Sequence, residues 1–233
     1  MILTKHLKYL NGLKKILNKI DKTFRNKKNI VDTIKVLQIV LHVLDKHKVK
    51  YYLDFGTLIG VARDNALIPW DDDIDISLYD ETDYKKIKSI VRDIKWRYNL
   101  RTYLYTFKSS RDARRKNGNP IYVENISFTN EKNYQILKIK DSKFWIFGRG
   151  NVTIDIFFKY KYKEKSYWFS DGKENSIPLE YSSDEMQEIT FYGIQCKIPK
   201  KYNEYLTYKY GNWKVPNEKW SHENDDYSIN NSN

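Results

Sequence analysis

The sequence predicts an α+β fold in which a mixed β-sheet is flanked by helices. Two helical patterns come first, several strands occupy the second half of the chain, and a short helical pattern lies near residue 205. Helices and strands that follow one another without regular βαβ alternation are typical of α+β domains. With 233 residues, the chain has the length of one domain with extensions.

The composition describes a folded, basic protein. Hydrophobic residues make up 40% of the chain and aromatic residues 15%, which excludes a disordered chain. The formal net charge of +12 is compatible with nucleic acid, an anionic membrane surface or a phosphorylated substrate as partner. The single cysteine, Cys196, has no partner for an internal disulfide, and no apolar run has the roughly 20 residues of a membrane span. We therefore expect a cytoplasmic protein.

Residues 1–28 are expected to form a basic amphipathic helical extension. Apolar residues recur at steps of three or four from Leu3 to Phe24, and lysines occupy the other face. Lysines also interrupt the first apolar residues, unlike the apolar core of a signal peptide. Such a helix packs on its own domain or lies on a membrane surface, so this segment is a candidate for peripheral membrane contact.

Residues 29–220 are expected to form one domain, followed by a disordered polar tail at 221–233. Residues 161–188 are polar and are expected to be irregular. The other expected elements are a helix at 30–44, a strand at 50–55, a helical turn at 57–63, a half-buried strand at 74–78, a helix at 83–96, strands at 121–128, 134–140, 144–147 and 152–158, a strand pair at 191–199 and a helix at 201–210.

An acidic cluster interrupts the basic chain at residues 69–76, which read PWDDDIDI. Four carboxylates within five positions repel one another. The alternation of a strand places Asp73 and Asp75 on one face, with Ile74 and Ile76 toward the core. A hard divalent cation, Mg²⁺ or Mn²⁺, is the simplest compensation for carboxylates gathered in this way.

Two other interpretations of this cluster exist. A solvated acidic turn would lack the interleaved isoleucines. A calcium-binding loop that starts at Asp71 would have Gly at its sixth position and Glu at its twelfth, but this chain has Ile76 and Thr82 there. The pattern therefore favours a metal site built on a strand.

A third carboxylate, Asp155, lies in the alternating segment NVTIDIFF at residues 151–158. An aspartate between apolar residues of a strand is uncommon, so it either ends the strand at a polar edge or faces a site. If this strand neighbours the strand at 74–78, three carboxylates converge on one metal ion. Phosphoryl and nucleotidyl transfer use such an arrangement.

The segment GTLIGVAR at residues 56–63 precedes the acidic cluster and follows a strand. Free backbone N–H groups at a helix start can hold a phosphate, and Gly56 has no side chain to block it. Arg63 can point back toward the same phosphate. The segment is not a Walker loop, because no Gly-Lys-Ser/Thr follows.

Residues 51–76, YYLDFGTLIGVARDNALIPWDDDIDI, resemble the signature of the LicD/fukutin-related phosphotransferases, a branch of the nucleotidyltransferase-fold superfamily. Further similarity lies in KIKD at 138–141, in TIDIF around Asp155 and in the stretch from Tyr205 to Pro216. The resemblance implies a nucleotidyltransferase-like fold. It also implies transfer of phosphocholine or a phospho-polyol from a CDP-linked donor to a glycan hydroxyl, with release of CMP.

Matching positions imply the roles of the acids. Asp73, Asp75 and Asp155 would be ligands of Mg²⁺ or Mn²⁺. Asp71 would be a further acid near the metal, and either Asp71 or Asp155 would accept the proton of the acceptor hydroxyl.

The same matching makes Gly56, Thr57 and Arg63 contacts of the donor phosphates, and Lys138 is expected to stabilise the leaving phosphate. The chain departs from the family pattern at Asp64, where the family commonly has His. Two alternatives remain: a nucleotidylyltransferase that releases pyrophosphate, and a basic nucleic-acid-binding protein without catalysis, although no nucleic-acid recognition motif is present.

Overall fold

The computed structural model describes most of the chain. The described residues are 30–106, 133–143, 148–170, 173–182, 185–222 and 226–229. The extension expected at 1–28 and the strands expected at 121–128 and 144–147 lie outside them, and they stay predictions.

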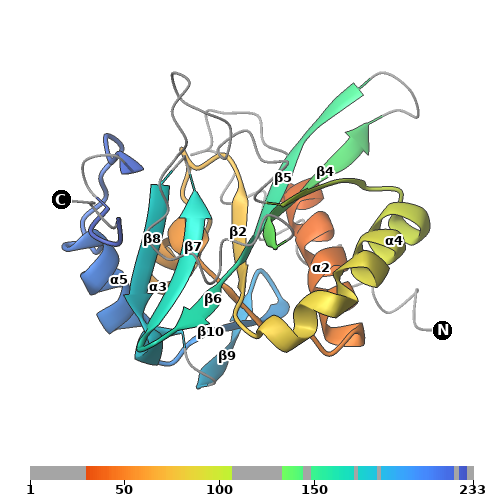
Figure 1. The fold of residues 1–233 in the computed structure, drawn as a ribbon. Coiled ribbons are helices and arrows are strands. Elements are labelled where there is room, and N and C mark those ends of the chain that lie inside the picture. Colours follow the sequence, from red (N-terminus) through yellow and green to blue (C-terminus); the bar gives the residue numbers. More distant parts are fainter. Residues whose placement is uncertain are drawn as a thin grey trace, which may run out of the picture.

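A five-stranded mixed sheet, in the order β1-β2-β5-β4-β3, forms the centre of the fold (Figure 1). β2 and β5 run parallel, and the other neighbouring strands run antiparallel. This arrangement confirms the predicted mixed sheet. The strands are β1 (Tyr51–Leu53), β2 (Ile74–Leu78), β3 (Arg101–Thr106), β4 (Tyr134–Lys143) and β5 (Gly148–Phe158).

Helices lie on two sides of strand β2 in the view of Figure 1: α2 and α4 are side by side at one side, and α3 and α5 are at the other. The periodic apolar face of α2 is buried, which confirms the helix expected there. Among the described residues, no helix combines the length and apolarity needed to cross a membrane. The helices are α2 (Ile30–Lys46), α3 (Phe55–Asp64), the 3₁₀ helix η1 (Glu81–Lys86), α4 (Ile87–Tyr98) and α5 (Tyr202–Tyr210).

The segment 161–188 is not irregular, which corrects the expectation from its polarity. It contributes to a sheet of β6 (Tyr160–Tyr162), β7 (Lys165–Ser170) and β8 (Lys173–Pro178), followed by the 3₁₀ helix η3 (Leu179–Tyr181). The buried residues of β8 are largely polar. Burial is tolerated where these side chains form hydrogen bonds, as Asn175 does with the carbonyl of Lys173 and the hydroxyl of Ser228. A hydropathy pattern therefore gives no signal of this strand.

A strand pair is present, but only its second strand, β10 (Ile194–Pro199), lies within the range 191–199 expected for both; the first strand, β9 (Met186–Phe191), begins earlier, in the segment expected to be irregular. The two residues that join them, Tyr192 and Gly193, both have positive φ, +48° and +78°. Such φ values are typical of the tight turns that fit the twist of a hairpin.

Two local expectations near the acidic cluster are corrected. The strand expected at 50–55 ends at Leu53, and Phe55 begins α3 with a φ of +48°. β2 is buried at all five positions rather than half-buried. Ser77, on the same face of β2 as Asp75, is fully buried, and its hydroxyl is satisfied there because it donates to Asp54 over 2.6 Å.

The C-terminal segment is not a disordered tail at residues 226–229. The N–H of Ser176 on β8 donates to the carbonyl of Ser228 over 2.8 Å, and Asn175 forms a β-bridge with Ile229. Asp226 and Ser228 are buried. The polarity that predicted disorder reflects side chains that pair with buried polar groups of β8 and α5.

Candidate active site

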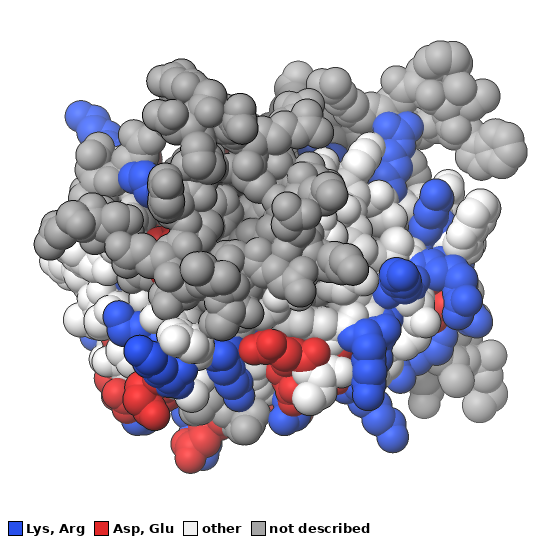
Figure 2. All heavy atoms as spheres, viewed as in Figure 1, with Lys and Arg blue, Asp and Glu red and all other residues white. Residues whose placement is uncertain are grey.

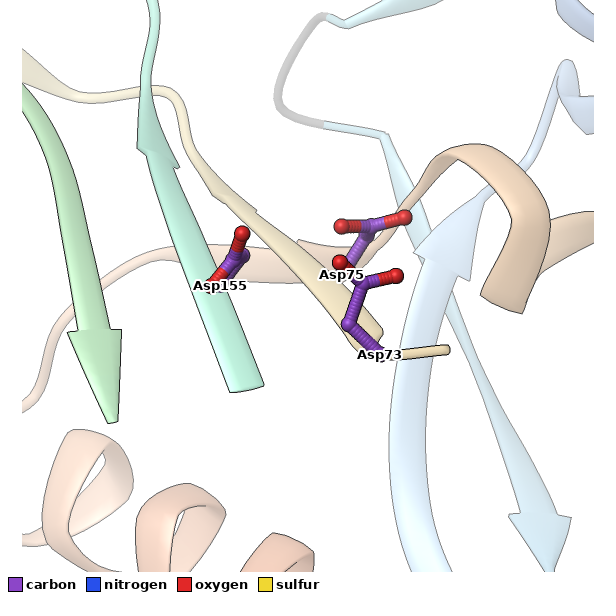
Figure 3. Close-up of side chains that lie close together, drawn as sticks. All are labelled: Asp73, Asp75 and Asp155. Atoms are coloured by element: carbon purple, nitrogen blue, oxygen red, sulfur yellow. The ribbon is translucent and has the colours of Figure 1, made fainter. Parts of the chain in front are cut away.

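Three aspartates converge where β2 and β5 run side by side. Asp75 and Asp155 are direct partners in the parallel register of these strands, and Asp73 comes just before β2. One carboxylate oxygen from each lies within 4.8 Å of the others. Figure 3 shows the three side chains in one group. The structure therefore brings together the acids that the two sequence patterns single out.

The backbone of Asp75 is held from both sides. The N–H of Asp75 donates to the hydroxyl of Thr57 over 2.9 Å, and its carbonyl accepts from the N–H of Asp54 over 3.0 Å. Thr57 is 1% exposed. Its hydroxyl lies against the strand rather than in open space, so the expected contact between Thr57 and a donor phosphate is not what this geometry favours. Thr57 positions Asp75 instead.

A buried ion pair anchors the start of α3. The carboxylate of Asp54 accepts hydrogen bonds from the Phe55 N–H, the Ser77 hydroxyl and the Tyr205 hydroxyl. It also pairs with the Lys159 ammonium over 2.6 Å, and both side chains are 0% exposed. Burial lowers the pKa of Lys159 to about 8, against the attraction of Asp54. Burial alone would raise the pKa of Asp54, but Lys159 and the hydrogen bonds outweigh it and lower that pKa. The ion pair thereby joins α3, β2, β5 and α5.

The three aspartates crowd negative charge in a small space, where Asp75 and Asp155 are buried and Asp73 is partly exposed. Burial, followed by the carboxylates of Asp73, Asp71 and Asp155, raises the pKa of Asp75 well above its ordinary value. The Oδ1 atom of Asp155 is buried and has no hydrogen-bond partner among the described residues. An orphaned carboxylate oxygen beside two further carboxylates is a donor set that suits a hard divalent cation. The residues present therefore fit the metal that the sequence pattern predicts.

Lys138 lies opposite Asp155 on the neighbouring strand β4. Its ammonium contacts Oδ2 of Asp155 over 2.5 Å. Burial acts to lower the pKa of Lys138, but the charge of Asp155 outweighs it and that pKa is raised. The pKa of Asp155 is also raised, because burial and Asp73 outweigh the attraction of Lys138. One lysine therefore does not neutralise the acid cluster.

The aspartates open into a cavity of about 820 Å³. Asp71 lines this cavity beside Gly56, where a Cβ atom would lie 2.2 Å from Oδ2 of Asp71. At Gly60, a Cβ atom would lie 2.4 Å from the carbonyl oxygen of Ala66. The two glycines therefore let the acidic loop pack closely on α3. Of the expected site residues, seven line the cavity: Gly56, Arg63, Asp71, Asp73, Asp75, Lys138 and Asp155.

The guanidinium of Arg63 is held in place at the edge of the cavity. Its Nε and Nη2 atoms both contact Oδ2 of Asp64, over 2.9 and 2.7 Å, and Nη1 donates to the carbonyl of Trp213 over 3.4 Å. Arg63 therefore faces the cavity with part of its charge balanced by the neighbouring residue.

The family whose description reads "LicD/FKTN/FKRP, nucleotidyltransferase domain" matches residues 48–201. This range is more than half of the chain and includes all the acids of the site. The chain belongs to the LicD family. The predicted resemblance is confirmed, and so is the nucleotidyltransferase-like fold class that it implies, because the family is described as a nucleotidyltransferase domain.

Curated relatives in the LicD family match over short stretches. The lipopolysaccharide cholinephosphotransferase LicD of Haemophilus influenzae is 33% identical over 78 residues, which are 30% of this chain and 29% of that protein. The human ribitol 5-phosphate transferase FKRP is 45% identical over 40 residues, which are 17% of this chain and 8% of that protein. The matches span less than a third of either relative.

Two solved structures have similar arrangements at low identity. The lincosamide antibiotic adenylyltransferase LnuA has a TM-score of 0.39 and 16% identity, covering 74% of this chain and 83% of that one. ANT(2")-Ia, solved with adenylyl-2"-tobramycin, has a TM-score of 0.36 and 14% identity, covering 82% of this chain and 83% of that one.

Sequence reasoning missed an aromatic and cationic wall of the cavity. Phe55, Trp168 and Lys209 line it. The ammonium groups of Lys159 and Lys209 lie 4.3 and 5.0 Å from the ring centre of Trp168, and 5.1 and 4.9 Å from that of Phe55. Lysine is almost never fully buried, so its sequence context gives no signal of such a place. Asp54, directly before the Gly-Thr segment, could have been recognised as the N-cap of α3.

Proposed function

We propose that this chain is a metal-dependent phosphotransferase that moves phosphocholine or a phospho-polyol from a CDP-activated donor to a glycan hydroxyl and releases CMP. The pairing of Asp75 with Asp155 in adjacent parallel strands, with Asp73 beside them, carries this proposal. The family membership and the activities after which the two relatives are named support the kind of group transferred.

In this proposal, Asp73, Asp75 and Asp155 hold Mg²⁺ or Mn²⁺. The bound ion would neutralise charge on the phosphate oxygens of the donor during transfer. Asp155 offers its unpartnered Oδ1 to the ion while Oδ2 keeps its contact with Lys138. Lys138 is then fixed beside the metal, where its charge stabilises the phosphate of the leaving CMP.

The donor phosphates contact Arg63 and the N-terminal turn of α3 in this account. Gly56 lies in that first turn and lines the cavity, so backbone N–H groups there are accessible. Thr57 is left out of this set because its hydroxyl holds the N–H of Asp75.

We assign the role of proton acceptor to Asp71. It lines the cavity, lies against Gly56 and is outside the group of three that would bind metal, whereas Asp155 belongs to that group. A new bond forms between the acceptor oxygen and the distal phosphorus of the donor as the bond to the CMP oxygen breaks. The hydroxyl proton passes to Asp71, and the remaining residues supply position and charge.

The acids of the cavity disfavour a nucleic-acid-binding function. Along the lower edge of the face shown in Figure 2, Lys and Arg side chains are also interspersed with Asp and Glu. A nucleic-acid footprint is usually a continuous basic patch or stripe. The acids that line the cavity would repel phosphates in the absence of a cation.

A panel of donors tests the proposal. The protein is incubated with Mg²⁺ and CDP-choline, CDP-ribitol, CDP-glycerol or a nucleoside triphosphate, and the released nucleotide is identified. We expect CMP from one CDP-linked donor, no release after chelation, and none from Asp75→Asn. The control, Asp72→Asn, changes an exposed neighbour that does not line the cavity. Release of pyrophosphate from a nucleoside triphosphate would instead identify a nucleotidylyltransferase.

A further inference from the structure

The cavity is completed by residues that follow the part of the chain matched by the LicD family. That match ends at residue 201. Beyond it, the last turns of α5 and the C-terminal segment contribute to the cavity lining, and they include both charged and aromatic side chains. Lys209, near the end of α5, connects the two parts, because its ammonium pairs with Asp226 of the C-terminal segment.

Lys209 and Asp226 form a buried ion pair at this wall. Their side chains are 3% and 0% exposed, and both residues line the cavity. The Lys209 ammonium also donates to the Ser228 hydroxyl over 2.9 Å. Ser228 in turn contacts Oδ1 of Asp226 through its hydroxyl, over 2.6 Å, and through its N–H, over 2.9 Å. The carboxylate of Asp226 is therefore fixed, and it fixes the lysine.

The backbone holds this arrangement as well. The N–H of Tyr227 donates to the carbonyl of Lys209 over 3.0 Å, and Ser228 bonds to Ser176 of β8 over 2.8 Å. The segment 226–229 is thus tied to α5 and to β8 at once. These bonds to α5 and β8 fix the position of the segment 226–229 at the cavity, although the segment is short.

The ammonium of Lys209 keeps capacity for one more partner. An ammonium has three N–H donors, and among the described residues two acceptors are present, Asp226 and Ser228. The rest of its surroundings is aromatic, with the ring centres of Phe55, Trp168 and Tyr210 at 4.9, 5.0 and 5.1 Å. These three rings also line the cavity.

Lys209 is close enough to the acids to feel their charge. Burial lowers its pKa, and the carboxylates that oppose this effect are Asp226, Asp54 and Asp75. Its positive charge therefore acts on the same space as the aspartates that would hold the metal. Arg63 and Lys138, the other cations named for this site, contact Asp64 and Asp155.

We propose that Lys209 binds the phosphate of the CMP leaving group, and that Asp226 is its positioning residue. This inference rests on the proposed function. Lys209 would donate its third N–H to a phosphate oxygen, in a buried, largely aromatic setting where such a charge-assisted hydrogen bond is strong. Asp226 would keep the ammonium at the cavity wall when no phosphate is bound.

Nucleotide binding to the Mn²⁺-loaded full chain tests this assignment. Because a single Lys209→Met change leaves Asp226 as an uncompensated buried charge, the main variant is the double change Lys209→Met with Asp226→Asn, which removes both charges. Calorimetry measures the affinities for CMP and for cytidine, which lacks the phosphate. Lys200→Met is the matched control, since Lys200 lies outside the cavity and is exposed.

We expect the double variant to bind CMP about tenfold to a hundredfold more weakly than the wild type, the size of one charged hydrogen bond. Its affinity for cytidine and its melting temperature should stay close to the wild-type values. If Lys209 and Asp226 had only a structural role, the double variant, which removes both charges together, should bind CMP as tightly as the wild type. CMP affinity equal to that of the wild type would overturn the assignment.

A second measurement keeps the test decisive if the double variant does not fold. In wild-type protein with ¹³C-labelled lysine, the signal of Lys209, assigned with Lys209→Arg, should shift on addition of CMP and stay in place with cytidine. An unchanged signal with bound CMP would contradict the inference and leave the proposed function standing. A wild type that does not distinguish CMP from cytidine would contradict both.

Discussion

Asp75 and Asp155 occupy directly opposite positions in the parallel pair β2–β5. The neighbouring antiparallel strand β4 adds Lys138 opposite Asp155, so two acids and a lysine follow one another across three adjacent strands. Side chains at paired positions of adjacent strands point to the same face of the sheet. The register of one sheet therefore sets the spacing of the groups that we propose for metal binding and for charge stabilisation.

Replacing Asp75 or Asp155 by Asn should remove metal binding without unfolding the chain. A residue that only orients a metal ligand is worth about tenfold to a hundredfold in affinity, so losing a ligand should cost at least about a hundredfold. Calorimetry with Mn²⁺ measures this loss, and Asp72→Asn serves as the control. Because burial and the neighbouring acids make Asp75 and Asp155 costly to ionise, both variants should be at least as stable as the metal-free wild type at pH 7. Wild-type Mn²⁺ affinity in Asp75→Asn would remove this residue from the proposed ligand set.

Stability of the metal-free protein should fall as the pH rises above the ordinary carboxylate range. The pKa of Asp75 is raised by burial and by neighbouring acids, so the folded state keeps a proton that the unfolded state has lost. The window runs from about pH 4 up to the raised pKa. Thermal unfolding at several pH values, with and without Mg²⁺, checks this. Mg²⁺ should reverse the fall, since binding favours the ionised carboxylates; a stability that is flat across the window in the absence of metal would contradict the charge account.

Thr57→Val should lower both the free energy of unfolding of the protein and its affinity for the metal. The variant leaves the N–H of Asp75 buried without an acceptor, which costs about 1–3 kcal/mol in unfolding free energy. Metal affinity should fall by about tenfold, because the strand that carries Asp75 is less well fixed. Thr57→Ser keeps the hydroxyl and is the matched control. If Thr57→Val kept full metal affinity but lost donor affinity, the originally expected phosphate contact would be right after all.

Adding a methyl group at Gly60 and at Gly56 should have different consequences. At Gly60 the new Cβ meets the carbonyl oxygen of Ala66, so Gly60→Ala should lose about 1–3 kcal/mol of unfolding free energy. At Gly56 it meets only the carboxylate of Asp71, a side chain that can turn away. Gly56→Ala should therefore fold normally but transfer its group as poorly as Asp71→Asn. Full activity in Gly56→Ala would argue against Asp71 as the proton acceptor.

The sequence was most informative where burial and polarity alternate. Asp73, Asp75 and Asp155 each lie next to isoleucines, and this pattern both predicted strands and marked the acids as unusual members of them. The parallel pairing of the two strands was a condition of the prediction, and the structure provides it. Long-range pairing depends on the whole sheet, so a local pattern does not determine it.

The sequence was least informative about buried polar groups. The strand β8 and the segment 226–229 read as irregular or disordered because their side chains are polar. In the fold, however, Asn175, Asp226 and Ser228 are buried, and the Ser228 hydroxyl contacts the side chains of both other residues. Lys209 reads as a solvent-exposed lysine for the same reason. Only the fold shows that each of these groups has a hydrogen-bonding or ionic partner, and these partners offset the free-energy cost of burying a polar group.

The most direct test of the central claim is the position of a bound metal ion. Crystals of the protein with Mn²⁺ and CMP should give a strong anomalous peak between Asp73, Asp75 and Asp155, with carboxylate oxygens at about 2.1 Å, a typical distance for such a hard cation. A structure in which Mn²⁺ binds elsewhere, and the three carboxylates hold no ion although CMP is bound, would contradict the account.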